Sequence, residues 1–232
     1  MEGAVRKGTI AAGYVHPTEV SSFFHASMVK TLMADALGKR RIVAHLPKYS
    51  SANVSNARNA IVRSFLDETA AEWLWMVDAD MQWQSDDLDV LLDHADEKRA
   101  PVVGGLCFGV EDGALFPTLY DFEQLDGGGI GTLRYDAYPE NAMFQVGATG
   151  AAFLVIHRRV LAAVRDRAFN PAYPWFQETQ IADKPCGEDV TFCIRAAQVG
   201  APVHVHTGVE IGHHKSYVLT AGQYREQRAA KE

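Results

Sequence analysis

The sequence predicts an α/β fold in which helices cover a central, mostly parallel sheet. Short apolar runs alternate with longer segments whose apolar residues recur every three or four positions, which is the pattern of strands separated by amphipathic helices. The 232 residues are 47% hydrophobic and 22% charged, and a chain of this length and composition can bury a full core. Intrinsic disorder and fibrous repeats are therefore excluded.

Six segments are predicted as strands because they are short, apolar and separated by polar stretches. In chain order they are residues 8–15, 41–46, 73–77, 101–108, 151–156 and 203–205. Helices are predicted over residues 53–69 and 189–199, where apolar residues repeat at helical spacing. In the first helix we place Val54, Ala57, Ile61, Val62, Phe65 and Leu66 on the apolar stripe, and Arg58, Arg63 and Asp67 outside it.

Residues 110–141 break this alternation and are rich in Gly, Asp and Tyr. We predict a hairpin or a mobile loop there. No Pro-, Ser- or Gly-rich linker divides the chain, and the candidate site residues are spread from Arg58 to His213. We therefore expect residues 1–232 to form a single domain.

Charge and apolar patterning exclude several classes of partner. The chain has 22 Lys and Arg against 29 Asp and Glu, a formal net charge of −7, so nucleic acid is not an expected partner. No apolar run reaches the roughly 18 residues of a membrane span, and the N-terminus lacks the apolar core of a secretory signal. We expect a cytoplasmic protein. The three cysteines (Cys107, Cys186 and Cys193) form no CxxC pair and are expected to be reduced, structural thiols.

The most informative stretch is WLWMVDADMQW, residues 73–83, in which a buried strand ends abruptly in Asp78 and Asp80. The carboxyl edge of an open α/β sheet is where such folds bind ligands. In an extended segment both side chains would point the same way, and two like charges so close need a cation or donor hydrogens between them. Magnesium or manganese suits oxygen ligands, and an added imidazole favours manganese. Spacing alone leaves it equally open that both are solvated loop acids.

Histidines are concentrated near the end of the chain. Alternation places His204 and His206 on one face of a strand, where they are expected to be structural imidazoles. His213 begins an irregular segment and is our candidate metal ligand, while His214 could be either. Lys215 is placed to meet a phosphate oxygen.

Four motifs then occur in order along the chain. They are Asn56-Ala57-Arg58-Asn59, Asp78-Ala79-Asp80, Gly187-Glu188-Asp189 and Gly212-His213. Together they resemble the motifs of GT-A glycosyltransferases of the family-2 type, which also occur in actinobacteria and their phages. The resemblance implies a single GT-A (Rossmann-like) domain, with a nucleotide-sugar-binding half over residues 1–108 and an acceptor-binding half and tail over residues 109–232. A phage-encoded member would act in the host cytoplasm.

The resemblance implies transfer of a sugar from a UDP- or GDP-type nucleoside diphosphate sugar to a hydroxyl of a glycan, protein or lipid. Asp78, Asp80 and His213 would hold Mn²⁺ or Mg²⁺; Arg58, Asp78 and Lys215 would contact the donor; Asp189 would be the general base, with Glu188 beside it. By position alone, Gly13, Val15 and His16 would line the base pocket. Gly150 and Ala151 would allow close approach of the acceptor, and Trp175 would stack on it.

Each of these functional roles has a purely structural alternative. Glu188 and Asp189 could cap a helix, Gly13 could serve a turn, Arg58 could be a surface arginine, and the small residues 147–152 could serve close packing. Trp175 and Phe176 could form a hydrophobic plug, and residues 219–232 could be a flap or a frayed end. For the whole chain, the alternatives are a sugar-phosphate nucleotidyltransferase or a non-catalytic carbohydrate-binding relative. The first strand, however, lacks the glycine- and arginine-rich phosphate loop of the former.

Overall fold

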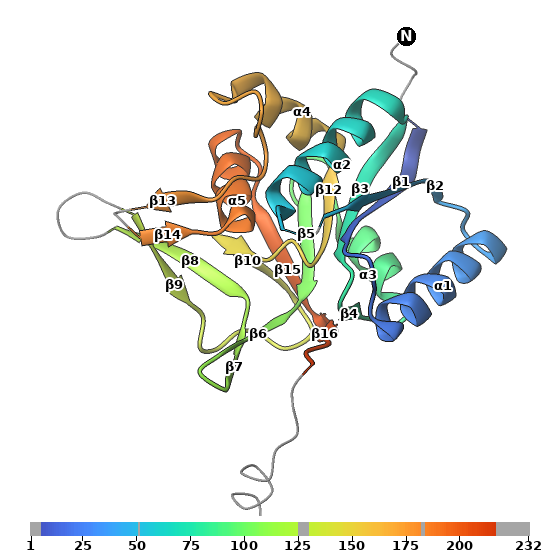
Figure 1. Ribbon diagram of the computed structural model, residues 1–232, viewed down its shortest axis with the longest axis horizontal. Coiled ribbons are helices and arrows are strands. Elements are labelled where there is room, and N and C mark those ends of the chain that lie inside the picture. Colours follow the sequence, from blue (N-terminus) through green and yellow to red (C-terminus); the bar gives the residue numbers. More distant parts are fainter. Residues whose placement is uncertain (1–5, 51, 125–129, 182–183, 217–232) are drawn as a thin grey trace, which may run out of the picture.

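The computed structural model describes residues 6–50, 52–124, 130–181 and 184–216. A seven-stranded sheet forms its centre, in the order β10-β15-β5-β12-β3-β1-β2 (Figure 1). Its strands are β1 (Arg6–His16), β2 (Ile42–Tyr49), β3 (Ala71–Asp78), β5 (Val102–Leu106), β10 (Met143–Val146), β12 (Phe153–His157) and β15 (Val203–Glu210). Only β12 and β10 run against the others. The predicted α/β class with a mostly parallel sheet is confirmed.

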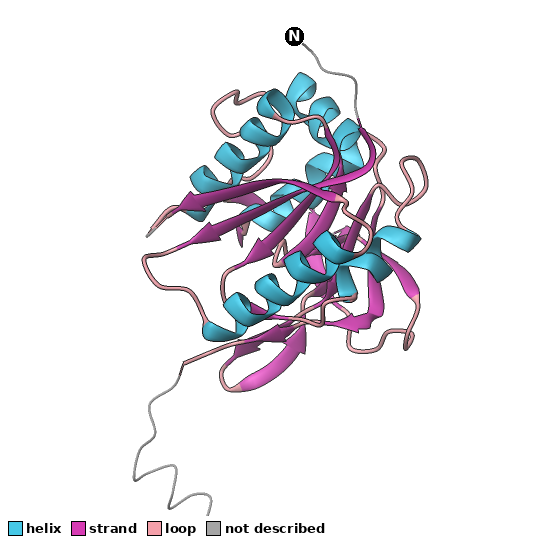
Figure 2. Ribbon diagram, turned by 90° about the vertical axis from the view of Figure 1, so that its right-hand side faces the viewer, coloured by secondary structure: helices cyan, strands magenta, loops and turns pink. Residues whose placement is uncertain are grey.

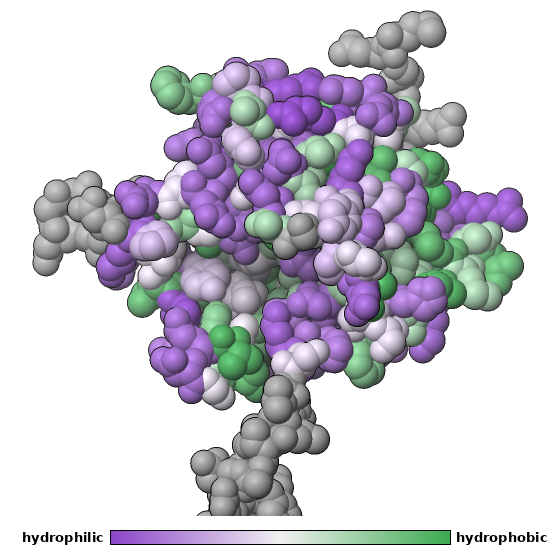
Figure 3. Space-filling model, in the orientation of Figure 1, coloured by the Kyte–Doolittle hydropathy of each residue, from purple (hydrophilic) through white to green (hydrophobic). Residues whose placement is uncertain are grey.

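Helices lie on both sides of this sheet (Figure 2). One face is covered by α2 (Val54–Glu68), α4 (Arg158–Arg167) and α5 (Glu188–Gln198), and the other by α1 (Ser22–Leu37) and α3 (Asp87–His94). Hydrophobic side chains also gather on the outer surface over α1 and β2 (Figure 3). None of the helices described is long and apolar enough to cross a membrane.

Both ends of α2 are fixed by side chains. Asn53 caps its start, accepting a hydrogen bond from the Asn56 amide at 2.8 Å. At its other end the guanidinium of Arg158 donates to the carbonyls of Phe65, Leu66 and Thr69, which satisfies acceptors that a helix terminus leaves free. The helix is thereby held at a fixed position against the sheet.

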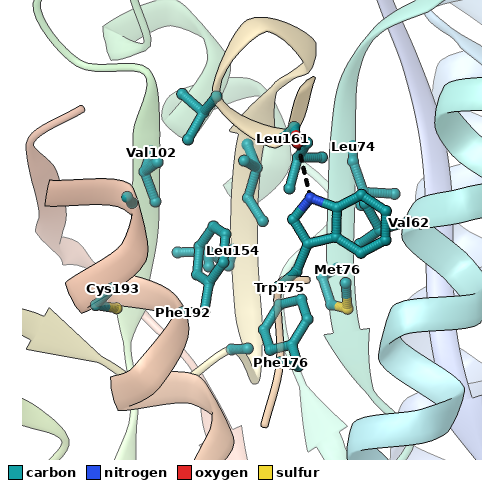
Figure 4. Close-up of a cluster of buried hydrophobic side chains, with 14 of the residues drawn as sticks. Val62, Leu74, Met76, Val102, Leu154, Leu161, Trp175, Phe176, Phe192 and Cys193 are labelled. Carbon is teal, nitrogen blue, oxygen red and sulfur yellow. Dashed lines mark hydrogen bonds between the residues drawn. The ribbon is translucent and has the colours of Figure 1, made fainter. Parts of the chain in front are cut away.

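The core on the α2 side is built around aromatic rings (Figure 4). Trp175 is fully buried there, and its indole Nε1 donates to the Leu161 carbonyl at 2.7 Å. Phe176 stacks on Phe192 of α5 with ring centroids 4.8 Å apart. The loop that carries Trp175 and Phe176 is therefore part of the core.

Smaller sheets lie outside the central sheet. They are the hairpin β6 (Phe108–Glu111) with β7 (Ala114–Pro117); the sheet of β8 (Leu119–Gln124), β9 (Ile130–Arg134) and β11 (Ala148–Thr149); the hairpin β13 (Thr179–Ile181) with β14 (Lys184–Cys186); and the pair β4 (Met81–Gln82) with β16 (Gly212–His213). The predicted hairpin within residues 110–141 is confirmed. All three cysteines are free and buried, as expected.

Candidate functional site

A cavity of about 810 Å³ opens at the carboxyl ends of β1 and β3. These strands are parallel neighbours, with Val15 opposite Asp78, so both strands end at the same edge of the sheet. The starts of α1, α2 and α5 and the segment after β16 complete its wall. The charged residues that line it are Glu19, Arg58, Asp78, Asp80, Glu188, Asp189 and Lys215. The structure therefore brings the four sequence motifs to one place.

Arg58 is a buried clamp between two carboxylates. Its Nη2 donates to both oxygens of Asp78, at 2.7 and 2.9 Å, and its Nη1 donates to Glu188 Oε1. Burial lowers the pKa of this guanidinium, but the charges of Asp78, Glu188 and Asp189 outweigh that effect and raise the pKa above its ordinary value. Arg58 is thus permanently charged. It lies on the buried face of α2, four residues before the fully buried Val62, whereas Val54 is 41% exposed. The prediction that placed Val54 on the apolar stripe and Arg58 outside it was therefore wrong for both residues.

Asn59, which the sequence reasoning missed as a functional residue, holds the loop behind Arg58. Its Nδ2 donates to the Phe176 carbonyl at 2.6 Å, and its Oδ1 accepts from the Trp175 amide at 3.2 Å. A buried amide between two polar segments is a usual way to satisfy loop backbone groups. Its place directly after Arg58 in the Asn-Ala-Arg-Asn motif was the available signal.

Asp80 and His213 meet because β16 pairs with β4 directly after the β3 end. His213 Nε2 lies 3.0 Å from Asp80 Oδ2, and Lys215 Nζ lies 3.1 Å from the same oxygen. His213 Nδ1 is 2.8 Å from the Phe108 carbonyl, which can only accept, so the Nδ1 proton is fixed there. His213 lies in the short strand β16, whereas an irregular segment was expected there.

The hydrogen bonds of this pair shift both pKa values. The bond to Asp80 raises the pKa of His213 above its ordinary value, against the opposing effect of burial. Burial raises the pKa of Asp80, but the bonds and charges of His213 and Lys215 outweigh it and lower the pKa. In the neutral imidazole the Nε2 lone pair faces a carboxylate, so a proton or a cation must lie between them.

The aspartates of the D-x-D motif have different partners. Asp78 is held by Arg58, while Asp80 bonds His213 and Lys215, so the protein itself gives the two carboxylates separate partners. Among the residues that the structure describes, no group of three or more His, Cys, Asp or Glu could hold a metal ion. Asp80 and His213 could supply one oxygen and one nitrogen ligand, a pair that suits Mn²⁺ better than Mg²⁺, with phosphate oxygens and water completing the coordination. Ligation of a metal by Asp78, Asp80 and His213 remains a prediction.

Asp189 is the second residue of α5 and lines the cavity beside Glu188. Burial raises its pKa, with added repulsion from Glu188, although the charge of Arg58 opposes the rise. A carboxylate with a raised pKa is a better proton acceptor near neutral pH. Gly150 lies next to it: a Cβ built there would be an ordinary 3.5 Å from Asp189 Oδ2.

Several predicted contact residues lie away from the cavity. Trp175 is buried in the core, so its side chain cannot stack on an acceptor as expected, and the plug interpretation of Trp175 is correct. Ala151 is buried in the same core and does not line the cavity, so it offers no close approach to an acceptor there. Gly13 lies inside β1, where a Cβ would be only 2.5 Å from Ile61 Cγ2, so it serves helix-to-sheet packing and not a base pocket. His16 packs on the rings of Tyr14 and Tyr49, although the neighbouring Val15 does line the cavity.

No protein-family model matches this sequence, and no curated protein matches it. Solved structures do match the fold. A197 from STIV aligns with a TM-score of 0.54 and 17% identity, over 89% of this chain and 86% of its own. GalNAc-T7, solved with UDP, GalNAc and Mn²⁺, aligns with a TM-score of 0.56 and 12% identity, over 92% of this chain but 44% of its own. These likenesses establish a shared GT-A-type fold, and the chain spans less than half of GalNAc-T7.

Proposed function

We propose that this protein is a metal-dependent glycosyltransferase that moves a sugar from a nucleoside diphosphate sugar, of UDP or GDP type, to an acceptor hydroxyl. The observation that carries the proposal is the charge balance of the cavity, where five carboxylates face two permanent cations, Arg58 and Lys215. A diphosphate would be repelled from such a site unless a divalent cation accompanied it. The GalNAc-T7 structure, which shares the fold, contains UDP and Mn²⁺, and this supports the proposal.

A bound Mn²⁺ or Mg²⁺ would supply Lewis-acid neutralisation of the diphosphate and of the charge that develops on the leaving group. Asp80 Oδ2 and His213 Nε2 are the protein atoms that would hold it. The bond from His213 Nδ1 to the Phe108 carbonyl fixes the ring orientation for this role. Lys215, already 3.1 Å from Asp80, would donate to a phosphate oxygen.

Asp189 is the residue that would take the proton of the acceptor hydroxyl. The neighbouring Glu188 has one oxygen engaged by Arg58, whereas Asp189 accepts only from the Val190 amide among the hydrogen bonds of its described surroundings. A positioned carboxylate base contributes about 10²- to 10⁴-fold to a rate. Arg58 thereby holds Glu188 and Asp78 in place and leaves Asp189 to act; attack in line with the departing diphosphate would invert the anomeric carbon.

The test is incubation with Mn²⁺ and a panel of UDP-, GDP- and dTDP-sugars. Slow release of free nucleoside diphosphate, absent for Asp80→Ala, supports transfer chemistry. A sugar-phosphate nucleotidyltransferase would instead need added pyrophosphate and would form a sugar 1-phosphate and a nucleoside triphosphate. Binding of a sugar without turnover of any donor would favour the non-catalytic alternative.

A further inference from the structure

A second hollow, of about 430 Å³, adjoins the cavity at the starts of α2 and α5, where Val54 and Glu188 line both. Glu188 Oε1 is engaged by Arg58, so its Oε2 is available to accept a further hydrogen bond. The next residue along α5 is Asp189, which also lines the cavity. We call this space the polar hollow; the rest of its polar lining consists of Asn53, Ser55, Asn170, Tyr173, Gln177 and Glu178.

One wall of the polar hollow is a loop, residues 170–178, that the protein holds in place. The guanidinium groups of Arg63 and Arg195 donate to four of its backbone carbonyls, those of Pro171, Ala172, Tyr173 and Pro174. Trp175 and Phe176 of the same loop point into the core (Figure 4). A wall that is ordered in advance need not lose conformational freedom when a ligand binds.

Three side-chain amides of the polar hollow are set up as hydrogen-bond donors. The Oδ1 atoms of Asn53 and Asn170 accept from nearby backbone amides at 2.8 and 3.0 Å, and Gln177 Oε1 accepts from Arg195 Nη2 at 2.8 Å. Because a guanidinium and a backbone amide can only donate, each oxygen must face the protein and each NH₂ group is left over. Among the residues that the structure describes, no hydrogen bond uses these three NH₂ groups.

The lining also contains acceptors, namely the carboxylates of Glu178 and Glu188. Sugar hydroxyls both accept and donate, so they match amide NH₂ groups that alternate with carboxylates, and the Tyr173 ring offers a surface for a sugar ring. Among the described residues that line the hollow, none is positively charged and only Ala52 and Val54 are aliphatic. A phosphate would lack a cation there, and a lipid chain or an apolar peptide anchor would find little to pack on. We propose that the polar hollow binds the acceptor and that the acceptor is a neutral oligosaccharide.

The polar surface continues beyond the polar hollow. A further hollow of about 660 Å³ shares Gln177 and Glu178 with it and extends along Thr179 and Gln180. These residues again carry amide, carboxylate and hydroxyl groups, so several units of a sugar chain find the same kind of partner. The acceptor is therefore a chain of sugars with one end at the border with the cavity.

The role as acceptor rests on the proposed function, whereas glycan binding does not. In the transfer the terminal hydroxyl gives its proton to Asp189 while its oxygen bonds the anomeric carbon of the donor. The bond from that carbon to the diphosphate oxygen breaks at the same time. The oligosaccharide leaves one sugar longer, and the nucleoside diphosphate is released.

The experiment is calorimetry of the full chain with neutral tetrasaccharides of glucose, galactose, mannose, xylose and N-acetylglucosamine, each with and without UDP and Mn²⁺. We expect at least one of them to bind, to accelerate nucleoside diphosphate release and to gain the mass of one sugar. Gln177→Glu keeps an oxygen toward Arg195 but replaces the donor NH₂ with an acceptor, so it should weaken that binding about three- to tenfold. The matched control is Gln198→Glu, which makes the same change at the exposed last residue of α5 and should leave binding unchanged.

Three outcomes would overturn the inference. One is that none of the tetrasaccharides binds; another is that Gln177→Glu and Gln198→Glu weaken binding equally, with circular dichroism showing both variants folded. The third is that nucleoside diphosphate release is accelerated by a peptide rich in serine and threonine, or by a detergent-solubilised polyprenyl phosphate, and by none of the sugars. The proposed function is tested separately by UDP and Mn²⁺ affinity and by donor turnover without acceptor. Glycan binding that Gln177→Glu weakens, with no turnover of any donor, would overturn the acceptor role and leave the ligand of the hollow correct.

Discussion

Replacing Arg58 with methionine tests whether its buried ion pairs stabilise the protein. The guanidinium bonds Asp78 and Glu188, whose side chains are 28% and 18% exposed. Removing one partner of a fully buried pair costs about 3–5 kcal/mol, because the remaining charge is poorly solvated. Water reaches these carboxylates in part, so we expect Arg58→Met to lower the free energy of unfolding by about 2–4 kcal/mol.

The measurement is urea unfolding followed by tryptophan fluorescence, extrapolated to water. The matched control is Arg165→Met, which removes a surface pair with Asp67 at 2.9 Å and should cost less than about 1 kcal/mol. The triple variant Arg58→Met, Asp78→Asn, Glu188→Gln should regain part of the lost stability, because it removes the two carboxylates bonded to Arg58 and leaves only Asp189 without the cation. Equal losses for the two arginine variants, or no recovery in the triple variant, would refute the reasoning.

Three further predictions concern the cavity and its support. Asp189→Asn should slow transfer by about 10²- to 10⁴-fold and leave donor affinity in calorimetry unchanged; transfer at the wild-type rate would reduce the residue to a helix cap. Because burial raises the pKa of Asp189, the wild-type rate should fall as pH drops through a value above the ordinary carboxyl pKa. By linkage, the ionisation of Asp189 costs stability as pH rises from the unfolded to the folded pKa, and the Asn variant should lack that loss in thermal unfolding. Asp80→Ala should abolish Mn²⁺-dependent donor binding, and His213→Ala should weaken Mn²⁺ affinity in calorimetry more than His204→Ala; the reverse order would assign the wrong imidazole. Gly13→Ala should cost about 1–3 kcal/mol of unfolding free energy, since its Cβ would lie 2.5 Å from Ile61 Cγ2. Gly150→Ala, with its nearest contact at 3.5 Å, should cost clearly less.

Periodicity predicted six of the seven strands of the central sheet and helices α2 and α5, but β10, α1, α3 and α4 were not assigned from the sequence. The six predicted strands all exist, although 101–108 is divided at Cys107 and the last strand continues to Glu210. Both predicted helices agree within one residue at each end. These elements are governed by local spacing of apolar residues, which a single sequence displays directly.

The site residues that were predicted wrongly are those whose positions depend on contacts between segments distant in the sequence. Arg58 can occupy a core position because two carboxylates neutralise it. These carboxylates lie 20 and 130 residues away along the chain, so no local pattern of the sequence predicts that this arginine is buried. Trp175 lies in a proline-rich loop that resembles an exposed one, yet Asn59 satisfies its backbone and permits burial. Asp78 and Asp80 take different partners because the chain turns at Ala79, where strand alternation no longer applies.

The order of the sheet also bears on how the chain can fold during synthesis. Strand β12 lies between β3 and β5, so the first 108 residues cannot complete their own sheet. At a translation rate of about 5–20 residues per second, a nascent chain would wait several seconds after β5 for the strand that fills this gap. Until then the edges of β3 and β5, both strongly apolar, stay unpaired, and a ribosome-bound intermediate of that length would be a substrate for chaperones.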